Sequence, residues 1–239
     1  ELERNTPEAW GNLGHALAEQ FRLDEAEAAY TTALALDPGM ASLHSGMAKV
    51  LLEKGAAAQA AGELRQALAK DANDPDLLSH QLFCLNYLPD SAPAEMTAIA
   101  RQYGDAIRSN IAPFDTWQCP AEPERKLRIG MVSGDLRRHP VGYLLRGPLR
   151  EIGKSGFEIF AYSNFPLEDD LSGELRQQCA GWTNVSEKSD AELARQIHDD
   201  RIDILLDLSG HTDYSRLAVF ARKPAPVQVT WLGYFATTG

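Results

Sequence analysis

Similar residues recur every 34 positions in the first half of the chain. The sets brought into register by this shift are Trp10, His44 and Leu78; Leu17, Leu51 and Leu85; Ala26 and Ala60; and Tyr30 and Leu64. An interval of this length is typical of helix-turn-helix repeats, in which small residues let antiparallel helices approach closely. The first half therefore predicts an array of paired helices.

The most complete copy of the repeat lies in residues 7–38. It reads Pro-x-x-Trp-x-x-Leu-Gly, continues through Ala26, Tyr30 and Ala33, and ends at Asp37-Pro38, so it resembles the tetratricopeptide repeat at nearly every diagnostic position. The copy at 41–74 is degenerate, and the one from Pro75 clearly keeps only its first helix. Because such repeats bury their apolar faces against their neighbours, two and a half copies predict a fragment of a longer array.

Charge and proline content divide the chain. Residues 1–120 contain 8 Lys and Arg against 17 Asp and Glu, whereas residues 121–239 contain 15 against 17. Between the halves, residues 112–124 carry three prolines, which fix φ and remove backbone donors. We therefore expect repeats and adjoining helices over 1–111, an extended linker over 112–124, and a second domain over 125–239.

Composition excludes several classes of protein. The net charge of −11 argues against a nucleic-acid partner. No apolar run is long enough to cross a membrane and no signal peptide is apparent, so we expect a cytoplasmic location without a membrane partner. The three cysteines, Cys84, Cys119 and Cys179, are widely spaced and form no CxxC pair, so we expect reduced thiols and no metal site.

The second half alternates strand and helix patterns. Extended runs are predicted at 127–132, 157–162, 182–185, 202–208 and 227–231. Helices are predicted from about 141, over 171–180, after a capping box formed by Ser189 and Glu192, and over 213–222. This alternation predicts an α/β Rossmann-like open parallel sheet.

Three loops of this sheet are candidates for a ligand site. In open α/β sheets, ligands bind outside the carboxyl ends of strands, usually where the strand order reverses between the first and fourth strands. That rule selects residues 133–140, 209–212 and 232–239, which should face one crevice. The first loop is not G-x-G-x-x-G and no G-x-x-x-x-G-K occurs, so dinucleotide-binding and P-loop proteins are excluded.

Two histidines lie in these loops. His139 follows Asp135 by four residues and could act as a general base beside that carboxylate. The spacing equally allows a structural role, in which Asp135 caps a turn and His139 hydrogen-bonds to the backbone. His211, in a Gly-His-Thr loop, could line the crevice without reacting.

The three loops also carry a family resemblance. The stretches 127–140, 203–212 and 220–234, the last containing Pro-Ala-Pro-Val-Gln-Val-Thr-Trp-Leu-Gly-Tyr, resemble the first catalytic lobe of the O-linked N-acetylglucosamine transferase and SPINDLY family. Tandem repeats ahead of that lobe strengthen the resemblance, which covers essentially the whole chain.

The resemblance implies an inverting glycosyltransferase that moves N-acetylglucosamine from UDP-GlcNAc to Ser or Thr hydroxyls of polypeptides. It needs no metal and no cofactor, since the nucleotide sugar is a substrate. His139 corresponds to the active-site histidine, as base or as orienter, and Asp135 to the carboxylate that fixes its tautomer. The residues that the resemblance assigns to substrate binding are Pro140, His211, Leu232, Gly233, Tyr234 and Thr237.

The resemblance also sets out partners and alternatives. Phe235-Ala236 stands where the family commonly has Pro-Gly, and Val141 stands where animal enzymes have Thr. The nucleotide would be held mainly by a second lobe that follows Gly239 in the family, so we expect this fragment alone to be inactive. The acceptor polypeptide would lie in the repeat groove. The alternatives are a SPINDLY-type O-fucosyltransferase and a non-catalytic interaction module, in which a repeat groove lined by residues such as Asn12, His15 and Asn86 binds extended polypeptide.

Overall fold

The computed structural model describes residues 6–109, 111–120, 122 and 124–239. The chain divides into two compact units, the first ending at Ala106 and the second running from Ile107 to Thr238. Each unit is described by itself.

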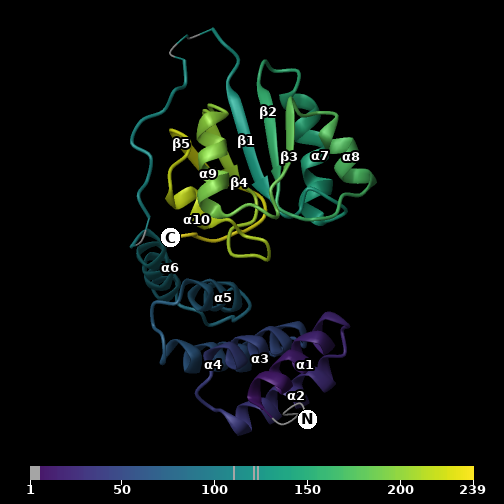
Figure 1. Ribbon diagram of the computed structural model, residues 1–239, viewed down its shortest axis with the longest axis vertical. Coiled ribbons are helices and arrows are strands. Elements are labelled where there is room, and N and C mark those ends of the chain that lie inside the picture. Colours follow the sequence, from purple (N-terminus) through teal and green to yellow (C-terminus); the bar gives the residue numbers. More distant parts are fainter. Residues whose placement is uncertain (1–5, 110, 121, 123) are drawn as a thin grey trace. The chain divides into compact units, whose positions relative to one another are not determined.

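The first unit is a series of helices (Figure 1). They are α1 (Pro7–Glu19), α2 (Leu23–Leu36), α3 (Ala41–Glu53), α4 (Ala57–Leu68), α5 (Pro75–Leu85) and α6 (Pro93–Arg108). The helices α1, α3 and α5 begin at Pro7, Ala41 and Pro75, which confirms the 34-residue period. A complete helix, α6, follows α5, although only the first helix of that copy was clear in the sequence.

Small residues form the centre of the first unit. Ala26 and Ala33 of α2 and Ala60 and Ala67 of α4 are fully buried, together with the larger side chains of Tyr30 and Leu64. Alanine at these positions lets neighbouring helices pack closely, as the sequence predicts. His44 is also buried; its Nδ1 lies 2.6 Å from Oε2 of Glu63 and its Nε2 lies 2.9 Å from the carbonyl oxygen of Pro38.

The second unit is a five-stranded parallel sheet with helices on both faces (Figure 1). Its strands are β1 (Arg128–Ser133), β2 (Glu158–Ser163), β3 (Gly181–Asn184), β4 (Ile204–Asp207) and β5 (Val227–Thr230), in the order β3-β2-β1-β4-β5. Its helices are α7 (Pro140–Ile152), α8 (Asp170–Arg176), α9 (Asp190–Asp199) and α10 (Leu217–Ala221). This topology confirms the Rossmann-like parallel sheet.

Each face of the sheet has its own core. On one face, Leu145 of α7 and Leu175 of α8 pack against Met131 and Ile159 of the strands. On the other face, Leu193 and Ile197 of α9 and Val219 of α10 pack against side chains such as Leu205. Strands buried on both faces explain the continuous apolar runs in the sequence.

Some predicted boundaries differ from those observed. Helix α8 ends at Arg176 rather than at 180, because the chain turns and the Ala180 N–H donates to the carbonyl of Ile159 in β2 (2.8 Å). Helix α10 begins at Leu217 rather than at 213, because Tyr214 has a φ of 61°, which no right-handed helix contains. The capping box of Ser189 and Glu192 is confirmed.

Residues 112–120, within the predicted linker, contain neither helix nor strand and contact the helices of the second unit, to which they belong. The Phe114 ring stacks on His198 of α9 with centroids 4.2 Å apart, and the Phe114 N–H donates to the carbonyl of Arg222 (2.8 Å). The Trp117 Nε1–H donates to the carbonyl of Lys223 (2.9 Å). This segment therefore packs along α9 and the end of α10.

Candidate active site

The candidate site lies at the carboxyl edge of the sheet. Because β1 pairs with β2 on one side and with β4 on the other, the strand order reverses between β1 and β4. The loops that leave β1, β4 and β5 therefore emerge from neighbouring strands, as the sequence predicts.

Specific contacts hold these loops together. The side-chain amide of Asn164, just after β2, donates to the carbonyl of Tyr214 (2.9 Å), and Arg216 donates to the Asn164 side-chain oxygen (3.0 Å). The rings of His211 and Tyr234 meet edge to face at 5.2 Å, which joins the loops after β4 and β5. Leu232 packs against the cluster that contains Leu136 of the loop after β1.

His139 is the N-cap residue of α7. Its Nδ1 accepts a hydrogen bond from the backbone N–H of Val141 (3.3 Å), so the proton of the neutral ring is on Nε2. The side chain is 37% exposed, which leaves the ring accessible. The hydrogen bond between the Val141 N–H and His139 is the backbone contact that the structural alternative predicts.

Asp135 lies beside His139 without a close hydrogen bond to it. Its Oδ2 is 3.6 Å from Nδ1 of His139, and its Oδ1 is 3.7 Å from a guanidinium nitrogen of Arg137. Both distances are too long for hydrogen bonds. Burial raises the pKa of Asp135, against the opposing charges of His139 and Arg137. Among the described residues, no hydrogen bond to the Asp135 carboxylate accompanies these two contacts, so this side chain does not form the turn cap of the structural alternative.

Two arginines complete the loop after β1. The Arg137 guanidinium lies 3.9 Å from the ring centroid of Phe165, and its Nε donates to the carbonyl of Gly134 (3.1 Å). Arg138 forms a two-pronged ion pair with Asp170 of α8 (2.6 and 2.7 Å). These contacts tie the loop after β1 to the segment after β2.

His211 is buried, with 3% of its surface exposed. Burial lowers its pKa to about 4, against the effect of a hydrogen bond to the backbone of Thr238. The ring is therefore neutral at pH 7. The neighbouring turn is shaped by Asp207, whose carboxylate accepts from the N–H groups of Ser209 (3.0 Å) and Gly210 (3.0 Å).

The lowered pKa of His211 predicts a pH-dependent stability. Between pH 6.5 and about 4 the unfolded chain binds a proton at His211 that the folded chain does not, so stability falls as the pH falls through this range, by up to about 3 kcal/mol. His211→Gln is expected to flatten this part of the profile. Urea unfolding at a series of pH values measures it, with His15→Gln, at an exposed histidine, as the control.

The remaining predicted site residues differ in exposure. Pro140 is the exposed first residue of α7, and Thr237 is also exposed. Leu232 has a φ of 72°, and Tyr234 is buried at 5% exposure. Gly233 packs against the chain itself, since a Cβ at this position would lie 1.8 Å from the carbonyl oxygen of Leu208.

The structure thus brings together Asp135 with His139, and His211 with Tyr234. Four residues that hold these loops together were not among the predicted site residues: Asn164, Phe165, Tyr214 and Arg216. The first two follow β2, whose carboxyl end the switch-point rule does not select, although β2 is the direct neighbour of β1. Extending the rule to strands on both sides of β1 would have found the segment after β2.

No group of three or more His, Cys, Asp or Glu side chains is placed to hold a metal ion in the described part of the chain. The three cysteines are free. Within the same residues, no helix has both the length and the apolar character that a membrane crossing requires.

Comparison with known proteins defines the class. A tetratricopeptide-repeat model matches residues 7–79, and the model described as glycosyl transferase family 41 matches residues 106–239. Since the second match covers more than half of the chain, this chain belongs to glycosyl transferase family 41.

Individual relatives agree with this assignment. A solved structure of a Thermobaculum terrenum O-GlcNAc transferase mutant superposes with a TM-score of 0.89 and 35% identity, over 98% of this chain and 45% of that chain. The probable UDP-N-acetylglucosamine–peptide N-acetylglucosaminyltransferases SPINDLY of Petunia hybrida and Eustoma exaltatum are 30% and 31% identical over 70% of this chain. The chain spans about a fifth of the length of these two relatives.

Proposed function

We propose that the protein transfers N-acetylglucosamine from UDP-GlcNAc to Ser and Thr hydroxyls of polypeptides, with inversion at the anomeric carbon. The observation that carries this proposal is the likeness to the Thermobaculum terrenum O-GlcNAc transferase over nearly the whole chain. We propose further that it acts in the cytoplasm, with the nucleotide sugar as substrate and without a metal or cofactor.

His139 is proposed to orient the reactants. In the transfer, the acceptor oxygen forms a bond to the anomeric carbon as the bond to the departing diphosphate breaks, and the hydroxyl proton must leave. Because Nδ1 of His139 accepts from the Val141 N–H, the Nε2–H of this partly exposed side chain is a donor and not a base. A hydrogen-bond donor at this place can hold an oxygen of the sugar or of the acceptor hydroxyl in line with the bond that breaks. The proton would then go to another acceptor.

A base role for His139 would require a rearrangement. Nδ1–H would have to donate to Asp135, which means giving up the bond to Val141 and closing a 3.6 Å separation. The arrangement in the structure therefore supports orientation over proton abstraction, the two roles that the family resemblance left open.

The other assigned residues are proposed to contact substrates. Pro140, Leu232 and Thr237, with His211 and Tyr234 behind them, would line the donor and acceptor side of the crevice. The acceptor polypeptide is proposed to lie along the repeats, where Asn12 and His15 of α1 are exposed. Asn86 already donates to the carbonyl of Leu82 (2.8 Å).

The test is a transfer assay with the full-length protein. UDP-GlcNAc and GDP-fucose, each labelled in the sugar, are incubated separately with an acceptor protein, and the labelled residues are identified by mass spectrometry. Labelled N-acetylglucosamine on Ser or Thr supports the proposal. Labelled fucose alone identifies a fucosyltransferase. Peptide binding with neither label transferred identifies an interaction module.

A further inference from the structure

A basic groove lies at the amino edge of the sheet, the edge opposite the candidate active site. Its volume is about 310 Å³, at the lower end of the range for small-molecule pockets. Its lining residues are Pro120, Arg125, Lys126, Arg128, Glu158 and Arg201. Arg128 and Glu158 begin β1 and β2, so the length of a six-residue strand, about 20 Å, separates this groove from the loop after β1.

The lining is strongly cationic. Four of the six lining residues are Arg or Lys, and one is a carboxylate, Glu158. This concentration stands out in a chain whose net charge is −11. A cleft in which one sign of charge predominates raises the local concentration of ions of the opposite sign.

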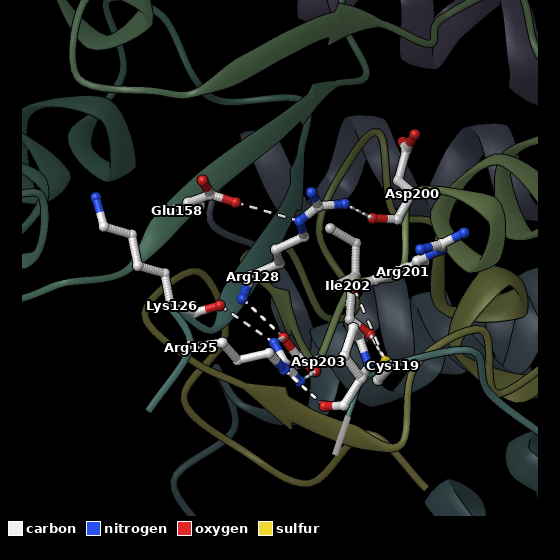
Figure 2. Close-up of polar contacts among 10 residues, drawn as sticks. Cys119, Arg125, Lys126, Arg128, Glu158, Asp200, Arg201, Ile202 and Asp203 are labelled. Atoms are coloured by element: carbon white, nitrogen blue, oxygen red, sulfur yellow. Dashed lines mark hydrogen bonds and ion pairs between the residues drawn. The ribbon is translucent and has the colours of Figure 1, made fainter. Parts of the chain in front are cut away.

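Two of the arginines are held in place by the protein. Arg125 forms a two-pronged pair with Asp203, with one contact at 2.7 Å, and Asp203 also accepts from the backbone N–H of Arg128 (2.8 Å). The Arg128 guanidinium donates to Glu158 (3.2 Å) and to the carbonyl of Asp200 (2.9 Å). These contacts, drawn in Figure 2, hold both guanidiniums in place and set each beside one carboxylate, so the excess positive charge of the groove comes from Lys126 and Arg201.

The other two cations have unused donors. Lys126 and Arg201 are exposed, and neither the ammonium nor the guanidinium forms a hydrogen bond or ion pair with any residue that the structure describes. Arg201 is nevertheless fixed at its backbone, with a φ of 55° and its N–H donating to the carbonyl of His198 (3.0 Å). Figure 2 shows Lys126 and Arg201 on opposite sides of Arg128.

We propose that this groove binds a small molecule bearing more than one phosphate group. Lys126 and Arg201 would each donate to a separate phosphate, on either side of the paired Arg128. Because cations stand on both sides of Arg128, a single phosphate would use only part of the site. The negative charge of Glu158 would repel the anion and weaken its binding to the groove. The site is separate from the proposed donor crevice.

The test uses inorganic triphosphate as the probe. Calorimetric titration into the purified full chain at low ionic strength, with metal ions chelated, is expected to show saturable binding that weakens as salt is added. Inorganic monophosphate is expected to bind more weakly. The double variant Lys126→Met/Arg201→Met is expected to bind triphosphate about tenfold more weakly. Glu158→Gln is expected to bind it about threefold more tightly.

A matched double variant removes two positive charges elsewhere on the second unit. Arg146 of α7 and Arg195 of α9 are exposed, so Arg146→Met/Arg195→Met lowers the net charge equally without touching the groove. It is expected to bind triphosphate like the unchanged protein. Circular dichroism checks that every variant is folded. The proposal is overturned by absence of saturable binding, by equal loss in the two double variants, by monophosphate binding as tightly as triphosphate, or by weaker binding to Glu158→Gln.

Discussion

Replacing His139 with Ala is expected to reduce sugar transfer by the full-length protein by a factor of at least about 100, while binding of the acceptor polypeptide is unchanged. The Nε2–H donor in the loop after β1 is lost, and with it the group that we propose aligns the reactants. The polypeptide is proposed to bind along the repeats, so its affinity should not change. Turnover of radiolabelled donor and fluorescence anisotropy of a labelled peptide measure the two effects.

His139→Ala removes both the Nε2–H donor and the N-cap of α7. A second variant separates the effects of these two losses. The loss of an N-cap costs about 1 kcal/mol of stability. In His139→Asn, the side-chain oxygen can take over the Nδ1 position and accept from the Val141 N–H, but nothing replaces Nε2. This variant is expected to be as stable as the unchanged protein and as inactive as the alanine variant. Normal turnover by His139→Asn would contradict the proposed role of Nε2.

Gly233→Ala is expected to destabilise the second unit by about 2–3 kcal/mol. The added methyl group would lie 1.8 Å from the carbonyl oxygen of Leu208, and the nearest atoms are backbone, which cannot rotate away. The loop after β5 would have to leave its place beside the loop after β4, so sugar transfer should fall as well. The free energy of unfolding in urea measures the first effect.

A glycine with free space provides the comparison. Among the described residues, a methyl group added at Gly173 of α8 would meet no atom within 4 Å outside its own stretch of helix, and Ala is favoured over Gly within a helix. Gly173→Ala is therefore expected to leave stability unchanged or to raise it by up to about 1 kcal/mol. If Gly233→Ala behaved in the same way, the contact between the two loops would not be needed for folding.

The sequence predicted the architecture because its signals are local and repeated. The starts of α1, α3 and α5 follow directly from the 34-residue period, and the buried strands follow from their apolar runs. Since neighbouring parallel strands present their carboxyl ends at one edge, the loops after β1, β4 and β5 were also predictable.

The detailed chemistry of the site was less predictable because it depends on loop conformation. The spacing of Asp135 and His139 allowed either a general base beside a carboxylate or a histidine hydrogen-bonded to the backbone, and in the structure His139 caps α7 through the N–H of Val141. That geometry depends on Gly142, where a Cβ would lie 2.2 Å from the carbonyl oxygen of Arg137. The contacts of Asn164 with the loop after β4 join residues about 50 positions apart, and no repeated pattern in the sequence indicates them.

The contacts of Phe114 and Trp117 bear on how such a lobe can be exchanged between proteins. Both residues precede β1, yet both donate hydrogen bonds to carbonyl groups just after α10, those of Arg222 and Lys223. The segment of chain that would have to be transferred together therefore includes residues 114–117 as well as the sheet and its helices. Recombination that joined a different repeat array directly to Arg125 would leave the ring of His198 without its aromatic cover.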